Sequence, residues 1–69
     1  MDQYVIYLKC NDGSGYYTGI ILTSTSREVG VHPYKSRAKI FDNRSEAFST
    51  AKSLKANFRC IILYDIQKF

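Results

Sequence analysis

A helix start in the middle of the chain constrains the fold more than any other feature of the sequence. The run 38–41, Ala-Lys-Ile-Phe, is extended in character, and Asn43 follows it as a favoured helix N-cap residue. Glu46 stands three positions later, where its carboxylate can reach back to the Asn43 N–H in a capping box. The pattern predicts that an extended segment gives way to a helix at Asn43.

The residues behind this cap have the spacing of an amphipathic helix. Ala47, Ala51 and Leu54 recur at helical intervals, and Phe48 widens the apolar stripe. We expect one helix of about three turns. The two alanines let its axis lie close to a sheet, and Asn57 is suited to a left-handed C-terminal cap.

The beginning of the chain has the pattern of a β-hairpin. Residues 4–9 are apolar on both alternating faces, which predicts a covered, central strand. Residues 11–15, Asn-Asp-Gly-Ser-Gly, are a dense turn signal, and 16–22 form the returning strand. Gly19 in that strand permits a bulge or the close approach of another group.

Two further strands are expected. Residues 23–26 have no apolar period and predict a loop, and 29–31 can form a short strand that His32-Pro33 ends, because proline lacks the N–H of a ladder. The chain turns again at 34–37. Residues 58–66 form the last strand, and because 60–63 are apolar on both faces, this strand is expected in the sheet interior.

These elements predict an α+β fold, with an antiparallel sheet of three to four strands and one helix packed on one face, in the order β-β-(β)-α-β. With 69 residues, of which 45% are hydrophobic, the chain is expected to form a single domain, 1–69, around a small core. It opens without a signal-length apolar segment, so a cytoplasmic protein is expected.

Cys10 and Cys60 lie far apart in the sequence and lack the CxxC spacing of a metal or redox site. Reduced thiols packed in strands are one interpretation. A disulfide that links the first and last strands is the other.

The positive charge of the chain is concentrated in its second half. Residues 35–59 hold seven basic and two acidic residues, a net of +5, whereas the whole chain carries +4. Such a block favours binding to nucleic acid or to an acidic protein surface. The alternative is that these charges only keep a helix face and an edge strand soluble.

The sequence offers no catalytic constellation. His32 is the single histidine, and the six acidic residues are scattered, so no pair for general acid–base chemistry is evident. The serines lack a nucleophile-elbow context, and 13–15, Gly-Ser-Gly, lacks the Lys-Ser/Thr of a phosphate-binding loop. We expect a protein that is not an enzyme and that uses no cofactor or metal.

Aromatic residues are the more informative candidates for a binding site. The chain has six tyrosines, which can cover a core, anchor a protein interface or stack on single-stranded bases. Tyr16 and Tyr17 point to opposite faces of one strand, so at most one of them can lie under the helix. The other is the best candidate for an exposed aromatic anchor.

Two resemblances extend this interpretation. Residues 4–14, YVIYLKCNDGS, followed by 16–20, YYTGI, resemble the opening hairpin of GIY-YIG endonucleases. That resemblance implies roles for Tyr17 and Arg27 only. The later helix offers Ala51 where the family has a metal-binding glutamate, so a nuclease of this type would be degenerate.

The second resemblance spans nearly the whole chain. A tyrosine-rich hairpin with a YYTG strand, then AKIF, an N-capped helix and a terminal strand resemble small uncharacterised α+β proteins encoded by phages and mobile elements. This implies a genetic context and a fold more than an activity.

The sequence therefore predicts a non-enzymatic binding module that docks on a host or defence protein and modulates it, with a nucleic-acid-binding accessory protein as the alternative. The candidate contact residues for either partner combine aromatic and basic side chains: Tyr16, Tyr17, Arg27, Lys35, Arg37 and Lys39. Apolar area on the sheet face without a helix also favours a homodimer, formed through that face or by edge pairing.

Overall fold

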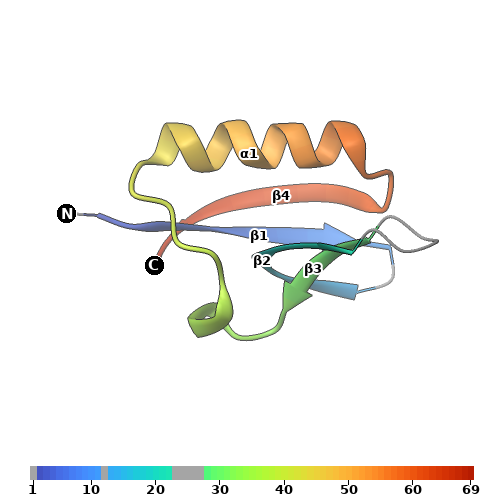
Figure 1. Cartoon of the computed structure of the whole chain (residues 1–69), viewed down its shortest axis with the longest axis horizontal. Helices are drawn as coiled ribbons and strands as arrows, with labels where there is room; N and C mark the ends of the chain where they lie inside the picture. The colour runs from blue at the N-terminus through green and yellow to red at the C-terminus, as the bar shows by residue number, and fades with distance from the viewer. Residues whose placement is uncertain (1, 12, 23–27) are drawn as a thin grey trace.

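The structure is a computed structural model that describes residues 2–11, 13–22 and 28–69. Its elements follow one another as β1 (Tyr4–Cys10), β2 (Gly13–Leu22), β3 (Glu28–His32), η1 (Lys35–Arg37), α1 (Arg44–Asn57) and β4 (Ile61–Lys68). The four strands form one antiparallel sheet in the order β3-β2-β1-β4, and α1 lies across one face of it (Figure 1). The predicted α+β fold is confirmed.

The helix begins where the cap predicts. Asn43 is the N-cap, and its Oδ1 accepts a hydrogen bond of 2.7 Å from the Glu46 N–H. In the described part of the chain, no bond returns from the Asn43 N–H to the Glu46 carboxylate, so half of the capping box is formed. The helix has 14 residues, about four turns and therefore longer than expected.

The predicted left-handed cap at Asn57 is wrong. Asn57 is the last helical residue, and Phe58 follows in an extended conformation, with φ −122° and its N–H bonded to the Leu54 carbonyl at 2.8 Å. The physical reason is that the Phe58 side chain is buried in the core. The chain leaves the helix directly toward the sheet and needs no left-handed residue.

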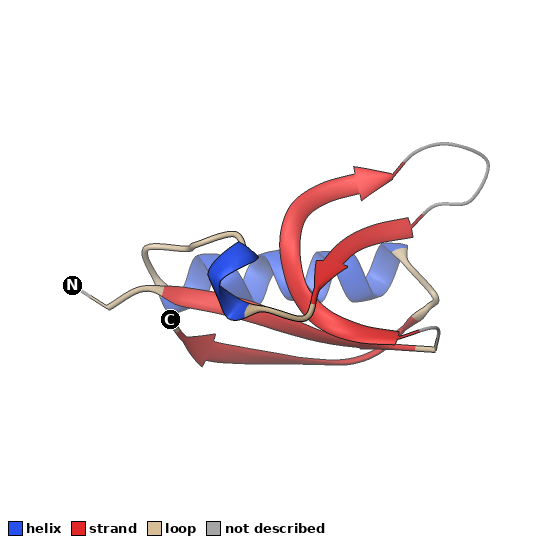
Figure 2. Ribbon diagram, turned by 90° about the horizontal axis from the view of Figure 1, so that it is seen from below, coloured by secondary structure: helices blue, strands red, loops and turns tan. Residues whose placement is uncertain are grey.

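The hairpin is confirmed, but β2 begins at Gly13, so residues 13–15, which were expected in the turn, belong to the strand and pair with β1. β2 then curls strongly away from β1. Only its first part pairs with β1, from Cys10↔Gly13 to Tyr7↔Tyr16, and the rest pairs with β3 (Figure 2). The β2–β3 register shifts between Tyr17 and Ile21, and Gly19 has φ +87° there, so the predicted irregularity at this glycine is confirmed.

The extended segment 38–41 fills the space that β2 leaves beside β1. The Lys39 N–H donates to the Tyr17 carbonyl at 2.8 Å, and Tyr4 and Phe41 exchange two N–H···O bonds of 2.8 Å each. Backbone groups at the start of β1 are therefore paired although no full strand lies there.

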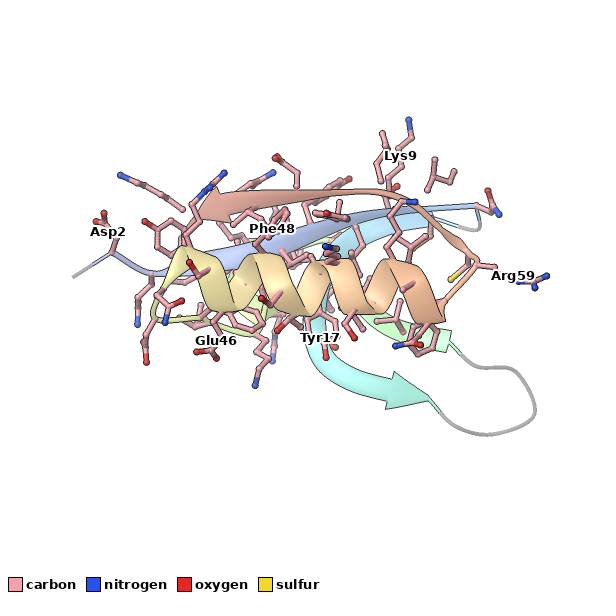
Figure 3. The ribbon with its side chains drawn as sticks, turned by 90° about the horizontal axis from the view of Figure 1, so that it is seen from above. Asp2, Lys9, Tyr17, Glu46, Phe48 and Arg59 are labelled. Carbon is pink, nitrogen blue, oxygen red and sulfur yellow. The ribbon has the colours of Figure 1, made fainter. Side chains whose placement is uncertain are left out.

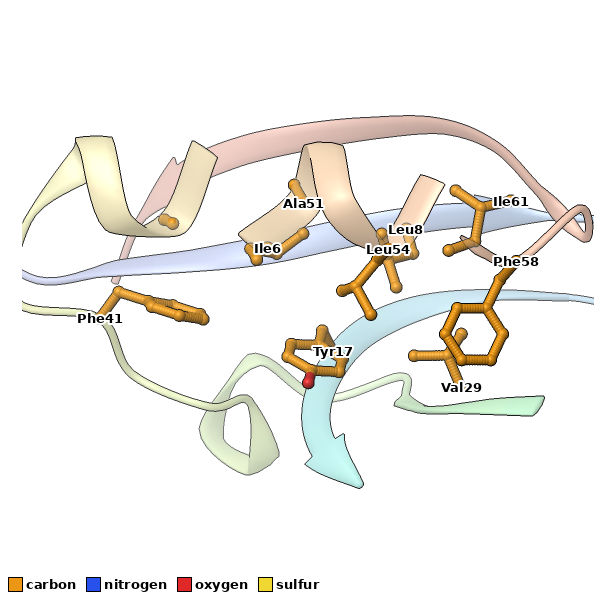
Figure 4. Packing of buried hydrophobic residues seen from close by; sticks show 10 residues of the cluster. Ile6, Leu8, Tyr17, Val29, Phe41, Ala51, Leu54, Phe58 and Ile61 are labelled. Atoms are coloured by element: carbon orange, nitrogen blue, oxygen red, sulfur yellow. The ribbon is translucent and has the colours of Figure 1, made fainter. Parts of the chain in front are cut away.

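The main core lies between α1 and the sheet. Ile6 and Leu8 of β1, together with Tyr17, pack beneath the buried helix residues (Figure 4). Ala47, Ala51 and Leu54 are those helix residues, as their spacing predicts. Phe48 is 45% exposed and does not extend the buried stripe.

The opposite face of the sheet, called here the lower face, is partly covered by η1. Val5 points away from α1, since it alternates with Ile6, and it has no exposed area. η1 lies on this side of the sheet, opposite α1 (Figures 1 and 2). The molecule thus has a second, smaller layer, formed by η1 where only a turn at 34–37 was expected.

The last strand corrects another expectation. β4 lies at the edge of the sheet, and Ile62 and Leu63 are 44% and 57% exposed, although their apolar pattern predicts an interior strand. The strand also begins at Ile61, because residues 58–60 make the connection from α1. An apolar pattern on both faces shows that a strand can be buried. It does not determine whether the strand lies in the interior or at the edge of the sheet.

Cys10 and Cys60 are not joined in a disulfide. Both are half-buried and pack against the core cluster. The structure therefore agrees with packed thiols, although only Cys10 lies in a strand and Cys60 lies in the connection from α1 to β4.

Candidate functional site

Aromatic side chains gather on the lower face of the sheet. The strand register pairs Tyr16 with Tyr7 on one side and with His32 on the other, so these three residues point to the same face. Tyr34 and Lys35 follow β3 and reach the same region. We call these five residues the lower-face cluster.

Two tyrosines form the centre of the cluster. The rings of Tyr7 and Tyr16 meet edge to face, with centroids 5.0 Å apart and an interplanar angle of 75°. The Tyr16 hydroxyl donates to Gln67 Oε1 at 3.3 Å, and Gln67 Nε2 donates to Asp65 Oδ2 at 3.1 Å. This chain of contacts crosses from β2 to β4 and holds the Tyr16 ring in place.

Lys35 places a positive charge beside these rings. Its Nζ lies 6.0 Å from the centroid of the Tyr16 ring and donates to the Lys68 carbonyl at 2.9 Å. The ring and the carbonyl fix the ammonium group over the cluster, in a geometry that permits a cation–π contribution.

His32 and Tyr34 form the outer part of the cluster. Their ring centroids are 5.5 Å apart, and His32 Nδ1 accepts a hydrogen bond of 3.1 Å from the Tyr34 N–H. The Tyr34 side chain is 67% exposed. An aromatic ring that is held at its backbone and open to solvent is the kind of group that anchors a partner.

The structure brings together some of the predicted contact residues and separates others. Tyr16 and Lys35 meet in the lower-face cluster, and Arg37 is exposed nearby in η1. Tyr17 is only 6% exposed and belongs to the core, which excludes it as a surface anchor and confirms that one tyrosine of the pair lies under the helix (Figure 3).

The other two predicted residues do not join the cluster. Lys39 packs its side chain over Gly19 and places Nζ 5.8 Å from the Phe41 ring centroid. Arg27 lies outside the described residues. Tyr7, His32 and Tyr34 were missed as site residues, although strand alternation alone could have placed Tyr7 on the face of Tyr16.

The basic block of residues 35–59 does not form one surface. Lys35 and Arg37 lie below the sheet, whereas Arg44, Lys52 and Lys55 are exposed on α1 above it. A ligand that binds the lower face therefore contacts only part of the positive charge that residues 35–59 carry.

A second surface is formed at the outer edge of β4. Three exposed apolar side chains flank it, namely Phe48, Ile62 and Leu63, with Phe48 on the α1 side and Leu63 on the lower face, and we call them the β4 edge patch. The Phe48 ring contacts the Tyr64 ring, with centroids 6.0 Å apart. Figure 3 shows Phe48 on the side of α1 that faces β4, with Tyr17 on the opposite side.

A hollow between α1 and β2 has no chemistry of its own. It is lined by Tyr17, Ser49, Thr50, Ser53 and Leu54. These groups offer hydroxyls without an acid, a base or a positive charge. In the part of the chain that the structure describes, no three His, Cys, Asp or Glu residues come close enough to hold a metal ion.

No protein-family model, curated protein or solved structure matches the chain. Among the described residues, no helix combines the length and the apolar character that crossing a membrane requires.

Proposed function

We propose that this protein is a non-enzymatic binding module that docks on a host or defence protein through the lower-face cluster and modulates it. The observation that carries the proposal is the exposed Tyr34 ring, which packs against His32 on the face where the Lys35 ammonium group lies over the packed tyrosines. Tyrosine anchors surrounded by contacts that exclude water are typical of protein interfaces.

The chemistry of the cluster favours an acidic partner surface. Lys35 and Arg37 contribute two positive charges on this side, and the whole chain carries +4. Complementary charge accelerates encounter and fixes the orientation of a complex. The phage-type order of motifs supports a host or defence protein as the class of partner.

Single-stranded nucleic acid is the second candidate ligand. The specific observation in its favour is the same combination of an exposed ring and a neighbouring lysine, because bases stack on aromatic rings while lysines meet the phosphates. The division of the basic block between two faces makes this ligand the weaker candidate.

Site-specific photo-crosslinking tests the protein partner. A photoreactive amino acid at position 34 should capture a partner from host cells, whereas the same group at position 55, on the exposed side of α1, should not. With the captured partner, Tyr34→Ala should weaken binding by about tenfold or more. Lys55→Ala serves as the charge control for Lys35→Ala, and equal effects of these two variants would contradict the proposed surface.

Fluorescence anisotropy with labelled single-stranded DNA and RNA decides the second candidate. Binding that weakens steeply with salt and is lost in Tyr34→Ala would establish nucleic acid as the ligand. The absence of a salt-dependent signal would leave the protein partner as the remaining proposal.

A further inference from the structure

The outer edge of β4 carries backbone groups that no strand of the described chain pairs. Within the sheet β4 has one neighbour, β1. The Phe69 N–H donates to the Gln3 carbonyl at 2.8 Å, which fixes the phase of the ladder. Because alternate residues turn their N–H and C=O groups to opposite sides, Asp65 and Gln67 also face β1, whereas Tyr64 and Ile66 face outward.

This edge is protected only near its two ends, by a β-bulge where the β1–β4 register shifts between Lys9 and Cys10 and by the Lys35 ammonium group on the Lys68 carbonyl. β4 has eight residues, contains no proline, and carries its lysine at the last position. The β4 edge patch adds three large apolar side chains that are each more than two-fifths exposed, namely Phe48, Ile62 and Leu63. Exposed apolar groups beside unpaired strand edges are typical of surfaces that pair with another chain.

We propose that a second copy of this chain covers the edge, through antiparallel pairing of β4 with β4. Each chain carries a net charge of +4, but β4 itself is neutral because the charges of Asp65 and Lys68 cancel. Two copies can therefore approach along this edge without the repulsion that other basic surfaces of the chain would cause.

Symmetry restricts the register of the pair. In a two-fold antiparallel pair, the residue on the axis faces its own copy. An axis at Asp65 sets two carboxylates opposite each other, which is unfavourable. An axis at Tyr64 separates them, and it lets the outward N–H and C=O of Tyr64 exchange two hydrogen bonds with the same groups of the second copy.

The register centred on Tyr64 also uses the apolar groups. It brings the two Tyr64 rings together at the axis and sets Ile66 beside Ile62 of the second copy, where the β-bulge of β4 begins. Each Tyr64 ring already contacts Phe48 of its own chain. The axis stands perpendicular to the sheet, so both helices lie on one side and both lower-face clusters on the other.

The proposed contact is one edge ladder with a small apolar cluster, which places it among small, reversible interfaces. We expect a monomer–dimer equilibrium that moves toward twice the 7.9 kDa chain mass as concentration rises. This inference rests on the edge of β4 and does not depend on the proposed function, although the two surfaces meet where Lys35 Nζ donates to the Lys68 carbonyl.

Light scattering combined with hydrogen exchange on the unmodified chain tests the dimer. At high concentration the amides of Tyr64 and Ile66 should become protected, and on dilution they should exchange rapidly. The amides of Asp65 and Gln67, which face β1, should stay protected at both concentrations and serve as the internal control. A monodisperse 7.9 kDa species at about 1 mM would overturn the proposal. So would a dimer in which the Tyr64 and Ile66 amides exchange rapidly.

Leu63→Glu provides the matched variant test, because this side chain is 57% exposed and its replacement should leave the monomer folded. In the register centred on Tyr64, residue 63 lies opposite Asp65 of the second copy, so the variant sets two negative charges against each other and should remain a monomer at the concentration at which the parent dimerises. Ser36→Glu, which adds the same charge at an exposed residue of η1, should dimerise like the parent. Unchanged dimerisation of Leu63→Glu would contradict pairing at β4, as would equal loss of dimer in both variants.

Discussion

β1 and β4 lie side by side in the sheet, and both carry apolar residues on both faces, but their surroundings differ completely. β1 has strands on both sides, α1 above and η1 below, and its Ile6 and Leu8 have no exposed area. β4 has one neighbouring strand, and its Leu63 is 57% exposed. The same kind of apolar sequence thus stabilises the monomer in one strand and remains available for association in the other.

The difference arises from the number of layers around each strand. An apolar side chain contributes to folding in proportion to the area that it removes from water, roughly 25 cal/mol per Å². Leu8 is covered completely within one chain, whereas Leu63 can remove most of its area only against another molecule. Substitution of each leucine therefore measures whether its strand stabilises the monomer or the association of two chains.

Leu8→Ala should give the largest effect. The substitution leaves a cavity beneath α1, and a fully buried leucine replaced by alanine costs about 3 kcal/mol. For a domain of this size the melting temperature should fall by roughly 12 to 24 °C, measured by circular dichroism. Leu8→Met, which conserves volume, should cost less than about 1.5 kcal/mol. A loss below about 1 kcal/mol for Leu8→Ala would show that β1 is not the enclosed strand.

Gly15→Ala should come next, because it tests the contact that holds β3 against β2. A Cβ at this position would lie 2.8 Å from the His32 carbonyl oxygen, which is a backbone atom that cannot rotate away. We expect a loss of about 1 to 3 kcal/mol, seen as a lower urea midpoint. Ser14→Ala is the control, since Ser14 is exposed. Equal midpoints for the two variants would contradict the close approach of β3.

The sequence predicted those parts of the fold that depend on local signals. The Asn43 cap, the hairpin and the irregularity at Gly19 each follow from the conformational preferences of a few neighbouring residues. The position of β4 at the edge could not be predicted in this way, because the strand order depends on contacts between distant segments. The extended exit at Phe58 likewise results from burial of its ring and not from any local preference.

The candidate site was predicted less completely, for the same physical reason. Alternation along β2 separated Tyr16 from Tyr17, and the structure confirms that separation. The neighbours of Tyr16 come from β1, β3 and η1, and only the sheet register brings His32 and Lys35 to it. A count of basic residues along the chain could not show that α1 and η1 carry them to opposite faces.

Asn43→Ala should have a moderate effect on the free energy of unfolding. It tests the start of α1, the helix that covers β1 from above. The variant removes the oxygen that accepts the Glu46 N–H at 2.7 Å, which should cost about 1 kcal/mol. The melting temperature should fall by roughly 4 to 8 °C. Glu46→Ala should cost less, because its backbone N–H, which makes the observed bond, is retained. Parent-like melting of Asn43→Ala would show that the cap does not hold the start of α1.

Leu63→Ala should have the smallest effect on the monomer and completes the comparison with Leu8→Ala. In dilute solution the exposed side chain contributes little, so the free energy of unfolding should change by no more than about 0.5 kcal/mol. At high concentration the parent should melt higher, because dimerisation stabilises the folded state by mass action, and Leu63→Ala should lose part of that gain. Urea unfolding at low protein concentration and thermal melting over a concentration series measure the two effects separately. A loss of about 2 kcal/mol or more in dilute solution would show that Leu63 is buried within one chain, and the contrast between β1 and β4 would then disappear.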